Sequence, residues 1–469
     1  MFEPVIGLEV HLALRTRSKL FCGCSAEGFG QGPNTNVCPV CLGLPGSLPV
    51  VNREALNLAI TFALALGCEV APVTRFHRKH YFYPDAPKNY QISQFDQPIG
   101  LAGSVVLPSG RTIGITRCHL EEDAGRLVHP TYADHSLVDL NRAGAPLLEM
   151  VTEPDLRSPE EARELLNEIR SIVRALGVSD ASPEEGKMRA DVNISLRLPG
   201  AGFGTKVEVK NLNSFRNVAN AIGYEIKRQS RLLEDGRVIE QETRGFNEGG
   251  QRTYTMRGKE GSADYRYLAD PDLPAVHVDE AWRAALITAM PELPGAKASR
   301  YVALGVRPSD AAQIAHEVET ARFFDAAVET YGGSAQNLAN WLNSEVAGVL
   351  NQRETTLDAT SLGPAALGGL IALIDEGVIS GAIAKELLPA VMDGDDPAAL
   401  VDRRGLRQVT DGDELSGLIE TVMADNQDLV ARVKANPKAI NALLGAVMKA
   451  SAGKAKPDLV REMLARRLE

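Results

Sequence analysis

The alternation of apolar and polar residues changes character near residue 290. Before that point, short segments alternate with a period of two, which is typical of strands that place one face on a core. These segments lie at residues 6–12, 110–120, 191–197 and 205–210. After that point, apolar residues recur at helical spacing between Gly, Pro and Ser. The pattern predicts an α+β fold, with a mixed and largely antiparallel N-terminal sheet followed by all-helical domains.

Start signals predict two helices within the strand-rich part. Ser158 is suited to cap a helix, Pro159 to occupy its first position and Glu161 to complete a capping box. A second helix is predicted from about Arg216 to Ser230. Further helices are predicted at residues 310–331, 335–351, 364–375, 381–392 and 413–424, and from Asn436-Pro437 and Pro457.

The length of the chain and the distribution of its charge predict several domains. A chain of 469 residues exceeds the size at which one core stops growing, so we expect domains at residues 1–292, 293–400 and 401–469. Residues 431–469 contain nine Lys or Arg and three acidic residues, which gives them a net charge of +6. Since the whole chain has a net charge of −11, the remaining residues carry −17. A basic segment on an acidic chain predicts contact with a polyanion, and a solvated helical surface is the alternative.

Four of the six cysteines are crowded near the N-terminus, as Cys22-x-Cys24 and Cys38-Pro-Val-Cys41. Two close pairs across a short loop predict a tetrahedral zinc knuckle, which is structural because four thiolates leave no open position. Four reduced cysteines without a metal are the alternative. The sequence has no apolar run of 18 residues and no signal-peptide pattern at its start, so we expect a cytoplasmic protein with reduced thiols and no membrane segment.

Ionisable side chains interrupt strands that otherwise read as core. Glu9 and His11 share one strand face, and Glu149 interrupts an apolar run where an unpaired carboxylate would be costly to bury. Alternation places Glu121 on the face of its polar neighbours, whereas a bulge would select Glu122 instead. Oxygen ligands in this number are typical of a Mg²⁺ site that receives phosphates.

Cations and a further acid accompany these strands. Asp191 lies on a polar strand face, and Lys206 and Lys210 are predicted to share a face of the next strand. Residues 75–83 mix cations with aromatic side chains, a pattern suited to stacking on a base and pairing with phosphates; a charged rim on an amphipathic strand is the alternative. The sequence contains no Walker loop, kinase signature or Gly-x-Ser-x-Gly elbow.

Long strings resemble one family over essentially the whole chain. The chain resembles the B subunits (GatB) of heterotrimeric aspartyl/glutamyl-tRNA(Asn/Gln) amidotransferases. The matching strings include Ile6-Gly-Leu-Glu-Val-His11, Tyr81-Phe-Tyr-Pro-Asp85, His119-Leu-Glu-Glu-Asp-Ala-Gly125, Val138-Asp-Leu-Asn-Arg142 and Gly445-Ala-Val-Met-Lys449.

The resemblance implies a ligase of protein biosynthesis. An N-terminal cradle domain would use ATP and Mg²⁺ to phosphorylate the side-chain carboxylate of Glu-tRNA(Gln) or Asp-tRNA(Asn). Ammonia from a glutaminase A subunit would then displace the phosphate. A small C subunit, the tRNA, and a cognate non-discriminating aminoacyl-tRNA synthetase are the candidate partners, with the tRNA held by the helical and tail domains.

The resemblance also assigns roles to individual residues. The residues assigned to the catalytic metal shell are Glu9, His11, Glu121 and Glu149; Asp191 is assigned to catalysis near the nucleotide, and Lys206 and Lys210 to phosphate neutralisation. Two alternatives stay open at the level of sequence. One is a non-catalytic, zinc-containing scaffold that binds tRNA, and the other is an ATP-dependent ligase that acts on a small molecule.

Overall fold

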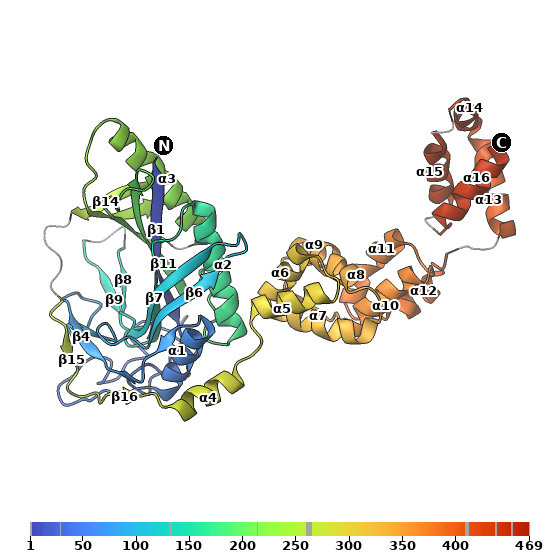
Figure 1. Ribbon diagram of the computed structural model, residues 1–469. Coiled ribbons are helices and arrows are strands. Elements are labelled where there is room, and N and C mark those ends of the chain that lie inside the picture. The colour runs from blue at the N-terminus through green and yellow to red at the C-terminus, as the bar shows by residue number, and fades with distance from the viewer. Residues whose placement is uncertain are drawn as a thin grey trace. The chain divides into compact units, whose positions relative to one another are not determined.

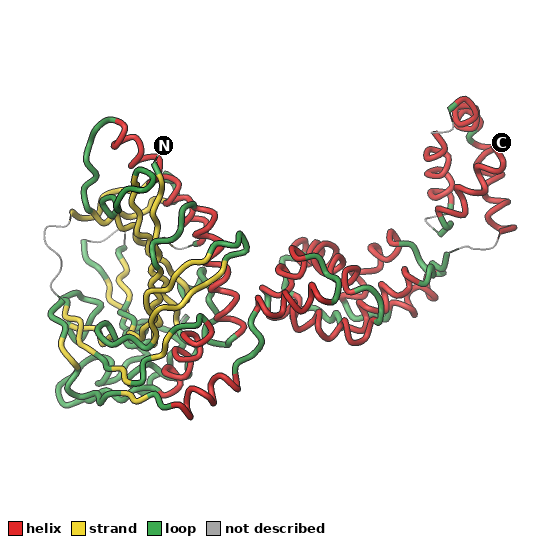
Figure 2. The backbone as a smooth tube through the Cα atoms, in the orientation of Figure 1, coloured by secondary structure: helices red, strands yellow, loops and turns green. Residues whose placement is uncertain are grey.

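A computed structural model of the chain describes residues 2–28, 30–130, 134–212, 214–258, 265–408, 412–436, 439–451 and 454–468. The chain divides into two compact units, Met1–Leu293 and Pro294–Glu469. Figures 1 and 2 show the strands in the first unit and a second unit built of helices and loops. The predicted α+β class is therefore confirmed. The limits of the three predicted domains stay a prediction.

Twelve strands of the described residues form one sheet in the first unit. The order is β14 (Arg252–Gly258), β13 (Glu242–Asn247), β12 (Val207–Leu212), β11 (Met188–Arg197), β1 (Glu3–Ala13), β10 (Pro146–Thr152), β7 (Thr112–Glu122), β5 (Tyr90–Ser93), β4 (His77–His80) and β15 (Leu268–Ala269). Beside this path, β6 (Gly100–Val106) pairs with β7 and with β2 (Glu69–Val70). The pair β12–β13 is parallel, and the other pairs are antiparallel. Two small ribbons join β3 (Val73–Thr74) to β16 (Val276–His277) and β8 (Arg126–Val128) to β9 (Leu137–Asp139).

The first unit has one large apolar core, between the sheet and its helices. These helices are α1 (Arg53–Ala65), α2 (Pro159–Ala175), α3 (Phe215–Glu234) and α4 (Glu280–Ala289). Leu8 and Val10 of β1 belong to the same buried cluster as Leu165 and Ile169 of α2. Because strand side chains alternate, the intervening residues of β1 face away from this core. The sheet therefore has a helix-covered face and a polar face.

The predicted capping of α2 is confirmed, with one difference. The Ser158 side chain accepts a hydrogen bond from the Glu161 amide at 3.1 Å. The Glu161 carboxylate accepts from the Arg157 amide at 2.7 Å, one residue before the cap. The cap still satisfies helix N–H groups that would otherwise lack partners.

The second unit contains two buried apolar clusters, one between Tyr301 and Val401 and one between Leu415 and Leu464. The predicted segment 310–331 forms two helices, because the backbone is extended at Glu317. The helix start predicted at Pro437 lies outside the described residues. No helix among the described residues is both long and apolar enough to cross a membrane. The helical elements are α5 (Pro294–Ala303), α6 (Pro308–His316), α7 (Val318–Tyr331), α8 (Ala335–Asn340), a π-helix (Trp341–Val346), α9 (Ala347–Gln352), a 3₁₀ turn (Leu357–Ala359), α10 (Pro364–Asp375), α11 (Gly381–Met392), α12 (Pro397–Arg404), α13 (Gly412–Asp425), α14 (Gln427–Ala435), α15 (Ile440–Ala450) and α16 (Pro457–Leu468).

Candidate functional site

Three neighbouring strands bring His11, Glu121 and Glu149 together on the polar face of the sheet. His11 of β1 lies opposite Glu149 of β10, and Glu121 lies on β7, the next strand across. The Nδ1 atom of His11 is 3.8 Å from Glu121 Oε1 and 3.9 Å from Glu149 Oε2. One ligand atom from each residue lies within 4.8 Å of the others, a spacing that suits a shared metal ion. We call these three residues the carboxylate cluster.

Polar atoms of this cluster lack protein partners although they are buried. Glu121 is 4% exposed and Glu149 is 7% exposed. No hydrogen-bond partner among the described residues reaches His11 Nδ1 or Glu121 Oε2. Buried polar atoms without partners are rare in folded proteins and call for an unseen ligand such as an ion or water. The donor set therefore fits a Mg²⁺ ion, which prefers carboxylate oxygens.

The electrostatic environment separates the two carboxylates. Burial, together with the charge of Glu149, raises the pKa of Glu121 to about 7. The pKa of Glu149 is lowered despite its burial, because His119, His11 and nearby cations favour its charged form. Burial lowers the pKa of His119 to about 4, so its imidazole is neutral near pH 7. The cluster consequently presents one firmly ionised carboxylate beside one that titrates near neutrality.

A second group adjoins the first through His11. Ligand atoms of Glu9, His11 and Asp191 also lie within 4.8 Å of one another. Glu9 accepts a hydrogen bond from Asn193 Nδ2 at 2.8 Å, and Asp191 accepts one from Lys210 Nζ at 3.0 Å. The pKa of Lys210 is raised, because Asp191 and Glu208 outweigh the effect of burial. Lys210 thus compensates carboxylates within the chain.

The two lysines predicted on one strand face occupy different settings. Lys206 is exposed and lies just before β12, which begins at Val207. The expectation that Lys206 extends this strand is therefore wrong. Lys210 lies within β12 and points to the acids of the site. The structure brings Lys210 to the site and leaves Lys206 in solvent.

The structure distinguishes the adjacent acids Glu121 and Glu122. The Glu122 carboxylate forms an ion pair with Lys88 at 2.5 Å and accepts a hydrogen bond from the Ile92 amide at 2.8 Å. Glu121 faces His11 instead. The register with β10 is irregular between Ile115 and Arg117 but regular from Arg117 to Glu122, so no bulge exchanges the two acids.

Cations and aromatic rings adjoin the cluster beyond the residues selected from sequence. Arg117 Nη2 lies 3.8 Å from Glu149 Oε1, and the Arg117 guanidinium lies 5.5 Å from the centre of the Phe95 ring. Phe95 stacks on Tyr267, with ring centres 4.3 Å apart. The charge of Lys79 acts on both carboxylates of the cluster. Alternation along residues 117–121 could have indicated that Arg117 lies on the same strand face as Glu121. No local pattern could have indicated Tyr267, because it comes from a distant segment.

A further, half-buried ion pair lies beside His11. Arg189 of β11 is directly opposite His11 in the register of the sheet. Its Nη2 atom is 3.2 Å from each carboxylate oxygen of Asp123. The Coulombic attraction of Asp123 raises the pKa of Arg189. Sequence alternation alone did not indicate this pair, because its partners lie 66 residues apart.

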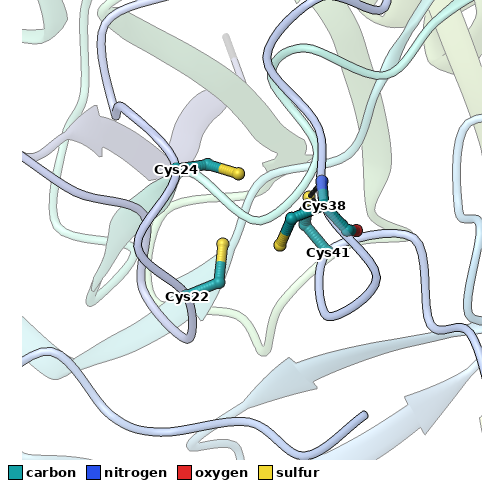
Figure 3. A group of neighbouring side chains, drawn as sticks. All are labelled: Cys22, Cys24, Cys38 and Cys41. Atoms are coloured by element: carbon teal, nitrogen blue, oxygen red, sulfur yellow. Dashed lines mark hydrogen bonds between the residues drawn. The ribbon is translucent and has the colours of Figure 1, made fainter.

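The four cysteines form a second candidate metal centre, which shares no residue with the carboxylate cluster. Figure 3 shows Cys22 and Cys24 on one loop, facing Cys38 and Cys41 on another. The four sulfur atoms lie within 4.8 Å of one another, and those of Cys38 and Cys41 are 3.8 Å apart. Thiolates at about 2.3 Å from a tetrahedral zinc ion would be separated by about 3.8 Å. The donor set therefore fits zinc.

The remaining cysteines belong to the hydrophobic core. Cys68 is 7% exposed and Cys118 is 0% exposed, and both lie in the apolar cluster of the first unit. Both are therefore core thiols outside the four-cysteine site.

Comparison with known protein families identifies the class to which this sheet and site belong. The GatB/GatE catalytic domain matches residues 4–284, and the GatB domain matches residues 322–468. The chain belongs to the GatB/GatE family, as its sequence strings predicted.

Relatives in several bacteria match nearly the entire chain. Three of them are described as the B subunit of an aspartyl/glutamyl-tRNA(Asn/Gln) amidotransferase. The protein of Deinococcus radiodurans is 54% identical, covering 100% of this chain and 99% of its own length. That of Thermus thermophilus is 52% identical, covering 99% and 98%, and that of Synechocystis is 46% identical, covering 100% and 98%.

Proposed function

We propose that this chain is the B subunit of a tRNA-dependent amidotransferase and activates the side-chain carboxylate of Glu-tRNA(Gln), Asp-tRNA(Asn) or both. The observation that carries this proposal is the carboxylate cluster, which combines buried, partnerless ligand atoms with a match to the GatB/GatE catalytic domain. A scaffold that only binds tRNA has no use for such a cluster.

The chemistry explains why this site needs cations and acids rather than a protein nucleophile. A carboxylate is a poor electrophile, because its leaving group would be oxide. Transfer of the γ-phosphoryl group of ATP to the carboxylate gives an acyl phosphate and ADP. Ammonia then attacks the carbonyl carbon and expels inorganic phosphate, which leaves the amide. Both partners of the first step are anions, so the site must offset their repulsion.

The carboxylate cluster supplies the ligands for a catalytic Mg²⁺ ion. His11, Glu121 and Glu149 would hold this ion, and Glu9, which lies two residues before His11 on β1, has a ligand atom within 4.8 Å of one of His11. A Mg²⁺ ion held by these residues would supply positive charge to offset the negative charge of the phosphates. Asp191, with Lys210, lies beside Glu9 and orients the nucleotide end of the site. The exposed position of Lys206 gives it at most a role in attracting anions.

Partners and domains extend this proposal. The chain works with a glutaminase A subunit and a small C subunit, and a non-discriminating aminoacyl-tRNA synthetase supplies the misacylated tRNA. Residues 1–292 form the catalytic cradle, residues 293–400 a helical domain, and residues 401–469 a basic tail that binds tRNA. Structural zinc occupies the four-cysteine site, and reduced thiols fit a cytoplasmic location.

Glu149→Gln tests the catalytic assignment against the scaffold. The substitution preserves size and removes the charge that pairs with Arg117. We expect loss of glutamine-dependent amidation and of tRNA-dependent ATP hydrolysis, with unchanged tRNA affinity. The assay uses the assembled enzyme with ATP, glutamine and both misacylated tRNAs.

The matched control is Glu153→Gln. Glu153 follows the same strand, where its carboxylate accepts a hydrogen bond from Thr116, and it lies outside the carboxylate cluster. This variant should keep wild-type activity. Full amidation by Glu149→Gln would eliminate the catalytic assignment, and amidation of free glutamate without tRNA would favour a small-molecule ligase.

A further inference from the structure

The most unusual cation of the N-terminal unit is Lys19, because its side chain is buried without a carboxylate. Lys19 is 1% exposed. Its Nζ atom donates to the Asn36 carbonyl at 2.9 Å and to Cys41 Sγ at 3.7 Å. In the described part of the chain, no carboxylate lies within ion-pair distance of this atom. Lys88, in contrast, is buried against the Glu122 carboxylate.

A buried ammonium group without a counter-charge is strongly unfavourable. The nearest group that can carry negative charge is the sulfur of Cys41, one of the four predicted zinc ligands. Four thiolates around Zn²⁺ carry a net charge of −2, which is itself costly in a partly buried site. An ammonium group at hydrogen-bond distance from one sulfur reduces the charge of the assembly to −1. The ammonium and the thiolate therefore each reduce the penalty of burying the other.

We propose that Lys19 is the charge-balancing residue of the four-cysteine zinc site and sets how tightly that site retains its metal. This inference rests on the proposed zinc occupancy. Lys19 is one of two donors to the same sulfur, because the Cys38 amide also donates to Cys41 Sγ, at 3.1 Å. Two N–H groups directed at one sulfur are expected of a metal-bound thiolate rather than a neutral thiol.

The same residue connects the two cysteine loops to the segment that leads into β10. The Lys19 amide donates to the Cys24 carbonyl at 2.9 Å, and its Nζ atom holds the carbonyl of Asn36. The Asn36 amide donates to Asn141 Oδ1 at 2.8 Å, and the Leu20 amide donates to the Gly144 carbonyl at 2.9 Å. Weaker metal retention should therefore loosen residues 138–145, which precede the strand of Glu149.

The test compares zinc release from the full-length wild-type chain and from Lys19→Met, which keeps the length of the side chain and removes its charge. Zinc content is measured first, and release to a chelating dye is then followed in time. Loss of an outer hydrogen-bond partner typically weakens metal binding by about 10- to 100-fold. We expect release to accelerate by about 10-fold or more, with faster amide exchange in residues 138–145.

A spectroscopic measurement separates charge balance from general loosening. In the Co²⁺-substituted protein, the Lys19 ammonium stabilises the sulfur electrons, so its removal should shift the sulfur-to-cobalt charge-transfer band to longer wavelength. Lys19→Gln provides a second neutral variant if Lys19→Met does not fold. Lys187→Met is the control, because Lys187 forms ion pairs with Glu27, three residues after Cys24, and with Asp180 and Glu185, and its ion pairs are to carboxylates and not to a sulfur.

Each outcome has a separate meaning. If the wild-type protein contains no zinc, the proposed metal site itself is wrong. Zinc-loaded wild-type protein, together with unchanged release and an unchanged cobalt band in both folded Lys19 variants, would overturn the role of Lys19. Accelerated release in Lys187→Met to the same extent would also overturn it, because the effect would then not depend on contact with the thiolate.

Discussion

Glu121 and Glu122 are adjacent in the chain but occupy opposite faces of β7, with different energetic roles. Glu121 is buried beside His11 and Glu149 with one oxygen lacking a partner. Glu122 is buried against Lys88, and both of its oxygens are engaged. A buried carboxylate whose partners are present in the chain contributes to the stability of the fold, whereas a buried carboxylate without such partners is expected to bind a ligand.

The paired substitutions Glu121→Gln and Glu122→Gln should therefore fail in different ways. Glu121→Gln removes a proposed metal ligand, so we expect loss of Mg²⁺-dependent ATP hydrolysis with little change in unfolding free energy. Glu122→Gln leaves the Lys88 ammonium buried without its counter-charge, which should destabilise the fold by roughly 3 kcal/mol. Urea unfolding and the ATPase assay on both variants measure the two effects. Equal stability losses would contradict this division.

Alternation along single strands was enough to predict which residues of one strand share a face, whereas the grouping of residues from different strands came from the family resemblance. The period of two in β1 and β7 correctly aligned Glu9 with His11 and selected Glu121 over Glu122 as the acid that faces His11. The aromatic pair Phe95–Tyr267 was out of reach, since the two rings come from segments 172 residues apart and no local pattern encodes their contact. Lys206 was misplaced because a strand end depends on pairing, and β12 pairs with β11 from Val207 onward.

At the scale of elements, the chain between the two cysteine pairs contacts the β8–β9 ribbon and the residues that follow it through the Asn34 side chain. Asn34 donates to the Val138 carbonyl at 2.9 Å and accepts from the Leu140 amide at 2.8 Å. The loops have little apolar burial of their own: Cys41 is the buried member of the four cysteines. Small loop-rich modules of this kind usually depend on a metal for their fold.

Cys38→Ser tests this dependence on metal. Loss of one thiolate should release zinc and increase amide exchange in the loops and in residues 138–145, while the helices of the second unit are unaffected. Metal analysis and hydrogen exchange measure both effects. Cys68→Ala, which alters a core cysteine outside the zinc site, should leave the zinc content unchanged. Undiminished zinc in Cys38→Ser would show that the four-cysteine site is wrong.

The bounds of helices were easier to predict from local sequence than the positions of short strands. Segments 364–375 and 381–392 were predicted with the bounds that α10 and α11 have, because apolar spacing and a first-position Pro or a capping Ser are local signals. The two-residue strands β2, β3, β15 and β16 were not predicted. Such strands exist through pairing with distant segments rather than through their own alternation.

At the scale of the whole molecule, the acidic chain carries its positive charge at one end. The net charge of +6 in residues 431–469 lies on a part whose buried cluster, Leu415–Leu464, shares no residue with the cluster that ends at Val401. Leu400 and Val401 are buried in the earlier cluster, so a truncation within α12 would damage it. A cut after Gln408 removes the basic tail and spares that core.

Truncation after Gln408 should consequently separate tRNA binding from the catalytic chemistry. Because Lys and Arg contacts to phosphates release counterions, the wild-type affinity for tRNA should fall steeply with salt, and the truncated chain should show both weaker affinity and a shallower dependence. Charge neutralisation of the exposed Lys449, Arg461 and Arg466 in the full-length chain is the matched variant, since it keeps the helices and removes the charge. Binding titrations at several salt concentrations, with zinc content as a check on the N-terminal unit, measure the effect. A salt dependence that is the same in all three proteins would mean that the positive end is a solvated surface and that tRNA is held elsewhere.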